Sequence, residues 1–515
     1  MRVATLRRPS RDMRTAPVAQ TAELPAPVGG LNARDSIAQM DAIDAVTLNN
    51  FVCGTTDVAL RDGYADYATG LPGPVRTLMT YNQPTGVPKM FAASGSNIYE
   101  VTSGGAVGAA VVTGLGNDKW QWINYATSGG TFLMAVNGTD LALLYDGTTW
   151  SNPAITGVTT SELINVMVWK ERIWFVQRNS LVAWYLAASS IAGAATAFDF
   201  RAMFKKGGYL MAQANWSIDG GTGIDDYLVA VTSEGEVAVY QGTDPASAST
   251  FARRGIFQVG NPIGRRCFEK YGGDVVLINR DGLVPLSKAL VSDRVNNRFA
   301  LTDKVNGAIT ALTKSHGTMF GWQVQLYPQQ NLLLLNVPVP SGATQYAMNT
   351  ITGSWSTFTG WDAFCFARMG EDVYFGGTGV VAKIWNVQSD NGDEITAECL
   401  QAFSKFGAPW LKHFKMVRPI FTTNGTPSVS LAVNVDYRTT VTYGGAFVNA
   451  LAGGVWGVGL WNQALWGSDQ LNQNWQSPSA IGYTGAVALK VVSGAATFRW
   501  QATQHVFERA AGNVL

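Results

Sequence analysis

The sequence predicts an all-β protein: a β-propeller of about seven blades, with an extended N-terminal arm before it and a C-terminal β-sandwich or β-barrel domain after it. Three observations lead to this prediction: a repeated strand–turn–strand phrase, the spacing of its copies, and a composition rich in glycine and poor in charge. The 515 residues include 56 glycines, and only 14% are charged, against roughly 25% in an average globular protein. We expect the arm over residues 1–50, the propeller over 51–395 and the C-terminal domain over 396–515.

The repeated phrase is an apolar strand, a tight polar or glycine turn, and a second apolar strand that tends to end in an aromatic and a polar residue. One hairpin cannot bury its own apolar face, but a ring or stack of such units can. Its copies span Lys89–Glu100, Phe132–Asp146, Arg172–Tyr185, Tyr227–Gln241, Val275–Leu286, Leu332–Asn349 and Val373–Asn386.

The spacing of these copies favours a ring. Their second strands recur at steps of about 40 to 60 residues, and propeller blades of four short strands repeat at roughly 40–50. The longer steps indicate loops inserted between blades. Gly138 and Gly282 can supply the positive φ that hairpin turns require. A pair of β-sandwiches, which also use short strands, is the alternative.

The two ends of the chain differ from the middle. Residues 1–14 hold five arginines against one acid, and a Pro/Ala-rich stretch follows through Pro27, so this part is predicted to be extended. It is expected either to dock on a neighbouring subunit or phosphates, or to be a flexible tail. Near the other end, Ser428–Val435 alternates apolar and polar residues, as a half-buried strand does. Residues 487–492 and 497–503 repeat this pattern.

Charge, cysteines and histidines point away from several functions. The net charge of +1 gives no field that would attract nucleic acid or a membrane, and the low charge suggests surfaces hidden against other subunits. We predict no catalytic, cofactor-binding or metal site, because no C-x-x-C pair or metal-ligand spacing occurs. The residues concerned are Cys53, Cys267, Cys365, Cys399, His316, His413 and His505. Cys365 is expected to be a small buried hydrophobe.

Targeting signals are also not expected. The basic N-terminus is not followed by the apolar run of a secretory signal. Two uncharged stretches, Asn179–Phe198 and Thr439–Ser468, are long enough to span a bilayer. Both are interrupted by glycine, serine or asparagine, so neither is predicted to be transmembrane.

Three local patterns were weighed for chemistry. Asp41 and Asp44 are expected to cap a short helical turn, because a metal needs more ligands than two. The tryptophans Trp456, Trp461 and Trp466 recur every five residues in a glycine-rich segment; packing within the domain or against a neighbour is favoured over contact with a host membrane. A basic cluster interleaved with aromatics is favoured as a solvated edge over a DNA contact. This cluster comprises Lys405, Lys412, Lys415 and Arg418, with Phe403, Phe406, Trp410 and Phe414.

Catalysis is not predicted. Segments 145–150 and 349–355 resemble part of the Asp-box of sialidases, but both lack the full pattern. Glycan hydrolysis needs two carboxyl groups at a defined separation. The candidate acids are Asp225, Asp226, Asp303 and Asp372. Nothing in the sequence brings two of them together, and Asp225-Asp226 is expected in a loop.

Several phrases near both ends resemble a known family. They are Gly29-Gly30-Leu31-Asn32, Met40-Asp41-Ala42-Ile43-Asp44-Ala45, Leu48-Asn49-Asn50-Phe51, Leu60-Arg61-Asp62-Gly63-Tyr64, Ala402-Phe403-Ser404-Lys405-Phe406-Gly407, Lys412-His413-Phe414-Lys415-Met416-Val417-Arg418-Pro419 and the Trp-Gly repeats at Trp456 and Trp466. In this order they resemble the tail nozzle, or tail tubular protein B, of short-tailed bacteriophages. The resemblance implies a propeller-containing protein that forms a hexameric ring around the DNA exit channel below the adaptor and portal.

The resulting prediction is a structural virion protein of a phage tail, assembled in the host cytoplasm and without enzymatic activity or cofactor. Expected partners are further copies in a homohexamer, the adaptor, tail fibre or other tail proteins, and double-stranded DNA that passes without sequence-specific contact. Transient contact with the host envelope at the tail tip is a further expectation. The alternatives are a carbohydrate-binding receptor module or a propeller glycan hydrolase or lyase of a phage tail.

Overall fold

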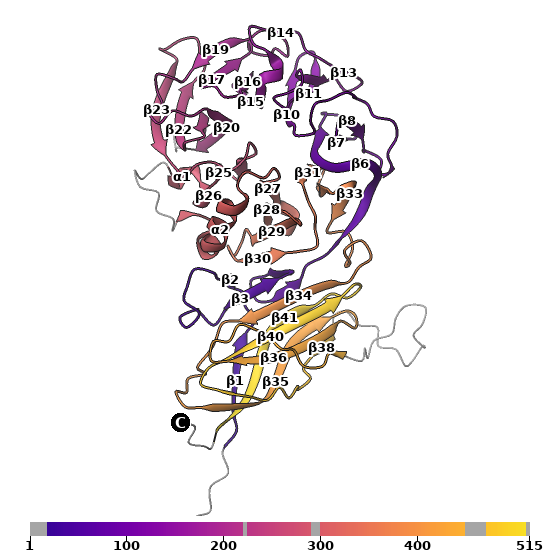
Figure 1. The fold of residues 1–515 in the computed structure, drawn as a ribbon, viewed down its shortest axis with the longest axis vertical. Coiled ribbons are helices and arrows are strands. Elements are labelled where there is room, and N and C mark those ends of the chain that lie inside the picture. Colours follow the sequence, from indigo (N-terminus) through magenta and orange to yellow (C-terminus); the bar gives the residue numbers. More distant parts are fainter. Residues whose placement is uncertain (1–17, 220–223, 290–298, 449–469, 511–515) are drawn as a thin grey trace, which may run out of the picture.

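The computed structural model describes residues 18–219, 224–289, 299–448 and 470–510. Figure 1 shows two parts: a ring of small sheets and, beside it, a longer body of paired sheets. The described chain is all-β apart from short helical segments. These are η1 (Thr160–Glu162), α1 (Leu286–Ala289), η3 (Asp303–Val305), α2 (Asn306–His316) and η4 (Pro328–Gln330).

The ring has a propeller-like arrangement that contains four meanders of four antiparallel strands each. The strands of these meanders are β10 (Gln121–Thr127), β11 (Gly130–Val136), β12 (Leu143–Tyr145) and β13 (Trp150–Ser151); β15 (Leu163–Trp169), β16 (Arg172–Gln177), β17 (Val182–Tyr185) and β19 (Thr196–Asp199); β20 (Leu210–Asp219), β21 (Ile224–Thr232), β22 (Glu236–Gly242) and β23 (Phe251–Gln258); and β27 (Gln323–Tyr327), β28 (Leu332–Val339), β29 (Gly342–Asn349) and β30 (Trp355–Phe358).

Three further groups of strands lie next to these meanders. They are β24 (Phe268–Tyr271), β25 (Asp274–Asn279) and β26 (Gly282–Pro285); β31 (Cys365–Met369), β32 (Asp372–Gly376) and β33 (Thr378–Ile384) with the first half of β6 (Tyr64–Tyr81); and the second half of β6 with β7 (Lys89–Ser94) and β8 (Asn97–Glu100). The small pairings of β9 (Gly105–Ala106) with β6 and of β14 (Ile155–Thr156) with β18 (Gly193–Ala194) are parallel. Because β6 pairs with β33 at one end and β7 at the other, it closes the ring.

The repeated phrase is confirmed as a set of hairpins. Each predicted copy is an antiparallel pair: β7–β8, β11–β12, β16–β17, β21–β22, β25–β26, β28–β29 and β32–β33. Gly138 and Gly282 have φ angles of +75° and +110°. The longest step between copies holds α1, η3 and α2, so at least part of its extra length is an insertion between β26 and β27.

The longer body consists of two sheets that share an apolar core. One sheet orders β38 (Gln470–Asn472), β35 (Lys412–Thr423), β41 (Arg499–Arg509), β5 (Val58–Leu60) and β4 (Phe51–Cys53), with β1 (Gln20–Pro25) on β41 and β39 (Ala480–Gly482) on β35. The other contains β3 (Asp44–Asn49), β34 (Ile395–Gln401), β40 (Gly485–Ser493), β36 (Ser428–Val435) and β37 (Phe447–Val448), with β2 (Gly30–Leu31) on β3. Phe421 and Trp500 of the first sheet lie in one buried cluster with Leu431 and Leu489 of the second.

The N-terminal region differs from the expected arm within its described part. Residues 18–60 contain β1 to β5, and β1, β3 and β5 pair with β41 or β34 near the other end of the sequence. The strand pairing therefore places residues 51–60 with the longer body rather than with the ring. A sequence pattern cannot indicate a partner strand more than 350 residues away, because alternation reports only burial of a face.

Two further expectations are corrected. Residues 36–45 form hydrogen-bonded turns but no helix; Asp44 begins β3 and is buried, so the predicted capping role of Asp41 and Asp44 is wrong. Asp225 and Asp226 lie in β21 rather than in a loop. The Trp456, Trp461 and Trp466 series lies outside the described residues, as does the arginine-rich segment 1–14. Among the residues that are described, no helix is long and apolar enough to cross a membrane.

Candidate functional site

The phrases that resemble the tail-nozzle family, up to Tyr64, come together where the ring meets the paired sheets. We call this region the junction; it comprises Gly29–Asp35, Asp44–Asn50, Arg61–Tyr64, Asp303–Lys304, Ser354–Trp361 and Ser389–Asp390. In Figure 1, β2 and β3 lie at the edge of the paired sheets that faces the ring. Two polar networks, one at Asp44 and one at Arg61, hold the junction together.

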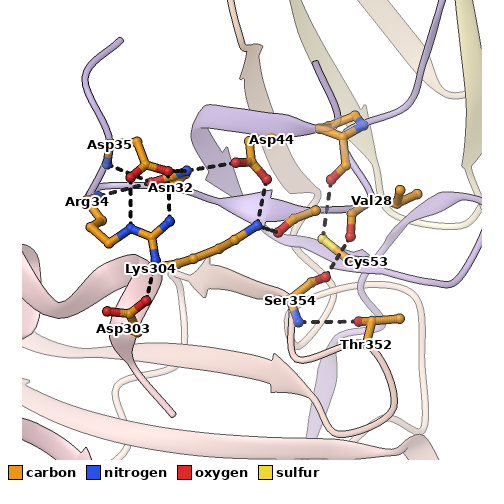
Figure 2. A network of polar contacts seen from close by, with 12 residues as sticks. Val28, Asn32, Arg34, Asp35, Asp44, Cys53, Asp303, Lys304, Thr352 and Ser354 are labelled. Carbon is orange, nitrogen blue, oxygen red and sulfur yellow. Dashed lines mark hydrogen bonds and ion pairs between the residues drawn. The ribbon is translucent and has the colours of Figure 1, made fainter. Parts of the chain in front are cut away.

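The first network centres on the Asp44 carboxylate, which is 1% exposed. Lys304 is the middle residue of η3, in the insertion between β26 and β27. Its Nζ donates to Asp44 Oδ1 at 2.8 Å and to the carbonyl oxygen of Gly29 at 3.1 Å. Asn32 Nδ2 donates to Asp44 Oδ2 at 2.7 Å. The network therefore ties three segments to one buried charge, as Figure 2 shows.

A more exposed ion cluster extends this network. Arg34 donates to both oxygens of Asp35 and also contacts Asp303. Hydrogen bonds from Arg34 and then Asn32 hold the pKa of the Asp35 carboxyl far below its usual range. Asp303 was one of the candidate catalytic acids; it serves here as a partner of Arg34 at the junction.

The second network centres on Arg61, whose side chain is 0% exposed. Its Nη1 and Nη2 donate to Asp390 Oδ1 and Oδ2 at 2.8 and 2.6 Å, and Nε donates to Asn50 Oδ1 at 2.9 Å. Nη1 and Nη2 also reach the carbonyl oxygens of Asp62 and Thr359. A guanidinium has five N–H donors, so every donor has an acceptor. The group lies 4.8 Å from the ring centroid of Trp361, a cation–π contact.

Close backbone approach also shapes the junction. A Cβ on Gly63 would lie 1.9 Å from the carbonyl oxygen of Ser389, and a Cβ on Gly30 would lie 2.6 Å from that of Trp355. Neither position can take a larger residue unless the backbone moves. The glycines of the Gly-Gly-Leu-Asn and Leu-Arg-x-Gly-Tyr phrases therefore permit the contacts that the two networks then hold.

Replacing Asp44 by Asn tests the first network. We expect the free energy of unfolding to fall by about 1–3 kcal/mol, because the amide loses the charge that Lys304 pairs with and places a donor where two donors already converge. Urea denaturation measures this loss. Asp41→Asn is the matched control: Asp41 is exposed, so its change should stay within about 0.5 kcal/mol. Equal effects of the two substitutions would contradict the role given to Asp44.

Asp226 and Asp372 lie in different strands, β21 and β32. Asp226 pairs with Lys170 at 2.9 Å, and Asp372 pairs with Lys383 at 2.6 Å. Hydrogen bonds from Ser217 and Lys170 lower the pKa of Asp226, which is the opposite of what a general acid needs. Asp226, Asp303 and Asp372 each pair with a different cation, which is Lys170, Arg34 or Lys383, respectively.

The predicted basic cluster is not a free cationic surface. Lys412 is 0% exposed and donates to the carbonyl oxygens of Ala408, Trp410 and Tyr483, and burial lowers its pKa. Lys415 lies 3.6 Å from Glu508. Arg418 bonds Gln504 and lies over the Trp475 ring. Lys405 alone of the four basic residues is exposed. The signal in the sequence is the alternation of inward- and outward-facing residues in β35, which places Lys412 on the buried face.

The four cysteines and His505 are buried, whereas His316 and His413 are partly exposed. All four cysteines are free and buried, and burial raises the pKa of Cys53 to about 12. Cys365 is buried as expected. Across the described ranges, no group of three or more His, Cys, Asp or Glu side chains could hold a metal ion. His505 is 0% exposed, and neither ring nitrogen has a hydrogen-bond partner.

The first strands of the small sheets line a central cavity of about 570 Å³. Its walls come from β6, β10, β15, β20, β24, β27 and β31. Arg266 fixes part of the wall: its Nη2 donates to Thr77 Oγ1 at 2.8 Å and to the carbonyl oxygen of Trp120 at 3.0 Å. Gln213 faces the cavity with neither amide atom paired, although it is only 4% exposed. The cavity is therefore polar and narrow.

Glu269 in this cavity gives a pH-dependent prediction. Burial raises its pKa to about 8, against only a small opposing effect of Lys270. The folded protein thus favours the neutral carboxyl, and stability is lost as the pH rises from the unfolded pKa near 4.5 through 8. We expect Glu269→Gln to raise the thermal midpoint relative to the native chain at pH 9 but not at pH 4. An equal shift at both pH values would contradict this prediction.

No protein-family model and no curated protein matches this chain. Several solved structures are similar in part. BBS1N in complex with ARL6DN has 10% identity and a TM-score of 0.40, covering 63% of this chain and 96% of that chain. The computationally designed Ika8 protein has 10% identity and a TM-score of 0.35, covering 66% and 96%. Sqt1 of Saccharomyces cerevisiae has 12% identity and a TM-score of 0.36, covering 63% and 98%. Likenesses this distant carry no argument about function.

Proposed function

We propose that this chain is a structural protein of a short phage tail, in which six copies form a ring, the nozzle, around the DNA exit channel. The observation that carries the proposal is the junction. Of the phrases that resemble the tail-nozzle family, those at the N-terminal end build the joint between the ring of small sheets and the paired sheets. A protein that must keep two bodies in a fixed relation needs such a joint.

The proposal includes the finer architecture. The seven first strands that line the central cavity support a propeller of seven blades, with β6 shared between the blade of β31 to β33 and the blade of β7 and β8. The paired sheets would form a separate β-sandwich domain, built from β34 to β41 and completed by the N-terminal strands.

DNA would pass between subunits rather than through the propeller. The central cavity of about 570 Å³ is crossed by hydrogen bonds of Arg266 and has the volume of a small-molecule site, so it cannot admit a duplex. A channel between subunits requires a closed ring, in which each copy uses two different surfaces. The net charge of +1 and the low fraction of charged residues suit a channel lining that does not hold phosphates.

The oligomeric state tests this function. The full chain would be purified and examined by light scattering and electron microscopy, alone and after mixing with the adaptor of the same tail. We expect rings of six subunits, alone or on the adaptor. A stable monomer that forms no ring with its tail partners would overturn the proposal. Arg61→Ala serves as a second variant: rings that lose their regular outline would support the junction as the source of rigidity, and unaltered rings would argue against that role.

A further inference from the structure

A second cavity, of about 850 Å³, opens at one mouth of the ring. We call it the mouth pocket. Its walls are the turns between β11 and β12, β16 and β17, and β25 and β26, together with segments that precede β10, β24 and β27. Arg265 lines both this pocket and the central cavity, so the two are adjacent. None of the junction residues lines the pocket.

The charge of the mouth pocket is one-sided. Five cationic side chains line it, and its lining contains no aspartate or glutamate: the cations are Lys119, Arg178, Arg265, Arg280 and Lys314. Within the described part of the chain none of the five forms a salt bridge, although twelve other pairs do. The chain as a whole is nearly neutral, with 37 Lys and Arg against 36 Asp and Glu. An uncompensated group of this kind creates a local field that attracts anions.

Some of these cations are held in place while they keep free donors. Arg178 Nη1 donates to the carbonyl oxygen of Gly138 at 3.0 Å, and Arg265 Nη1 donates to that of Asn137 at 3.4 Å. Each guanidinium keeps further N–H groups for a ligand. Lys119 Nζ lies 5.4 Å from the ring centroid of Phe320. Burial lowers the pKa of Arg265, Tyr209 raises it, and the nearby Arg178 charge lowers it.

The rest of the lining could bind the hydroxyl groups and the ring of a small ligand. Asn179, Asn261 and Ser233 contribute amide and hydroxyl groups, and Tyr209 contributes an aromatic ring that is 36% exposed. Small-ligand sites combine such convergent polar groups with a volume of roughly 300–1,000 Å³. The mouth pocket differs from a flat basic patch for a nucleic-acid backbone, because its walls are formed by turns of several separate sheets.

We propose that the mouth pocket binds a sugar-like ligand that carries a phosphate, sulfate or carboxylate group. The guanidinium and ammonium groups bind the anion, with bidentate hydrogen bonds available from the arginines, and the amide and hydroxyl groups bind the sugar hydroxyls. The ligand is either a free sugar phosphate or the acidic end of a glycan chain, because both present the same chemistry. This inference does not depend on the proposed tail function.

Isothermal titration with glucose 6-phosphate, glucuronic acid, glucose and inorganic phosphate tests the site on the full chain. We expect at least one of the two acidic sugars to bind with a dissociation constant below about 1 mM, at least about tenfold tighter than either glucose or phosphate. Raising the salt should weaken this binding, because the contacts are ionic. Binding of phosphate as tight as that of the acidic sugars, or no binding of any acidic probe, would overturn the proposal.

Variants locate the binding. Lys314 and Arg280 are exposed, so Lys314→Gln and Arg280→Gln should fold normally; each should weaken the acidic sugar at least about fivefold, as expected for the loss of one charge-assisted contact. Lys405→Gln is the matched control, because Lys405 is an exposed lysine of the paired sheets; it should leave binding unchanged. Equal weakening by all three would show a general charge effect and contradict the site.

One more probe distinguishes the two possible sources of the ligand, a free acidic sugar and the end of a glycan chain. The methyl glycoside of the acidic sugar that binds mimics a unit linked into a glycan chain. Binding within about threefold of the free sugar would indicate a glycan end, and a loss of more than about tenfold would indicate a free sugar phosphate or acid. A ring-forming protein without sugar binding would refute this inference alone, and a sugar-binding monomer would refute the proposed function alone.

Discussion

Replacing Arg61 by Ala is expected to lower the free energy of unfolding by about 3–5 kcal/mol, the range found when one partner of a buried ion pair is removed. The reason lies in what remains: the Asp390 carboxylate, 14% exposed, loses two charge-assisted hydrogen bonds, and Asn50 Oδ1 loses one. The cation–π contact with Trp361 is lost as well. Chemical denaturation followed by tryptophan fluorescence measures the change.

Two further variants make this prediction specific. Arg499 also contacts an aspartate, Asp57, at 3.5 Å, but its side chain is 58% exposed, so Arg499→Ala should cost less than about 1 kcal/mol. Arg61→Lys keeps the charge and loses the planar fork, so an intermediate loss is expected. If Arg61→Ala and Arg499→Ala destabilised the protein equally, the buried network would not be the reason.

Acidification is expected to destabilise the paired sheets through His505. Burial beside Phe406 and Phe414 lowers its pKa to about 4, whereas the unfolded chain takes up the proton near pH 6.5. The depressed pKa of a base means that stability is complete above pH 6.5 and falls as the pH drops from 6.5 to 4. A shift of this size corresponds to about 3 kcal/mol.

His505→Phe isolates this contribution. The variant has no group to protonate at position 505, so its stability should depend less on pH between 6.5 and 4 than that of the native chain. Phenylalanine is a suitable replacement because the side chains around His505 are also phenylalanines. The quantity to compare is the slope of unfolding free energy against pH, because carboxylates contribute equally to both proteins. His413→Phe is the control: His413 is partly exposed and bonds Ser479. Parallel slopes for native protein and His505→Phe would refute the assignment.

Local features of the fold could be predicted from the sequence, and distant ones could not. The hairpins could be predicted because both strands of each one, and the glycine or polar residues of its turn, lie within about 20 consecutive residues. The partners of β1, β3 and β5 were not found, because they lie near the opposite end of the chain. Pairing over such distances leaves no periodic signal, since a strand only alternates between a buried and an exposed face.

The junction illustrates the same limit for the candidate site. The phrases around Asp44 and Arg61 are recognisable in the sequence by their resemblance, but the sequence pattern at Asp44 predicts a helix cap. An aspartate in a short apolar run is compatible with a cap or with a buried ion pair, and only Lys304, 260 residues away, decides between them. The mouth pocket was missed for a related reason, because each of its five cations comes from a different turn or helix.

The position of β41 has a consequence for how the chain can be synthesised and folded. This strand, Arg499–Arg509, is the partner of β1, β5 and β35. Similarly, β6 can pair with β33 only after β33 has been synthesised. A nascent chain therefore leaves the ribosome with the edges of β1 and β5 that face β41 unpaired until β41 emerges, and such edges favour aggregation. Contacts between the two ends also slow folding, because the long loop between them must close first. Loss of only the last dozen described residues would thus release the beginning of the chain as well as its end.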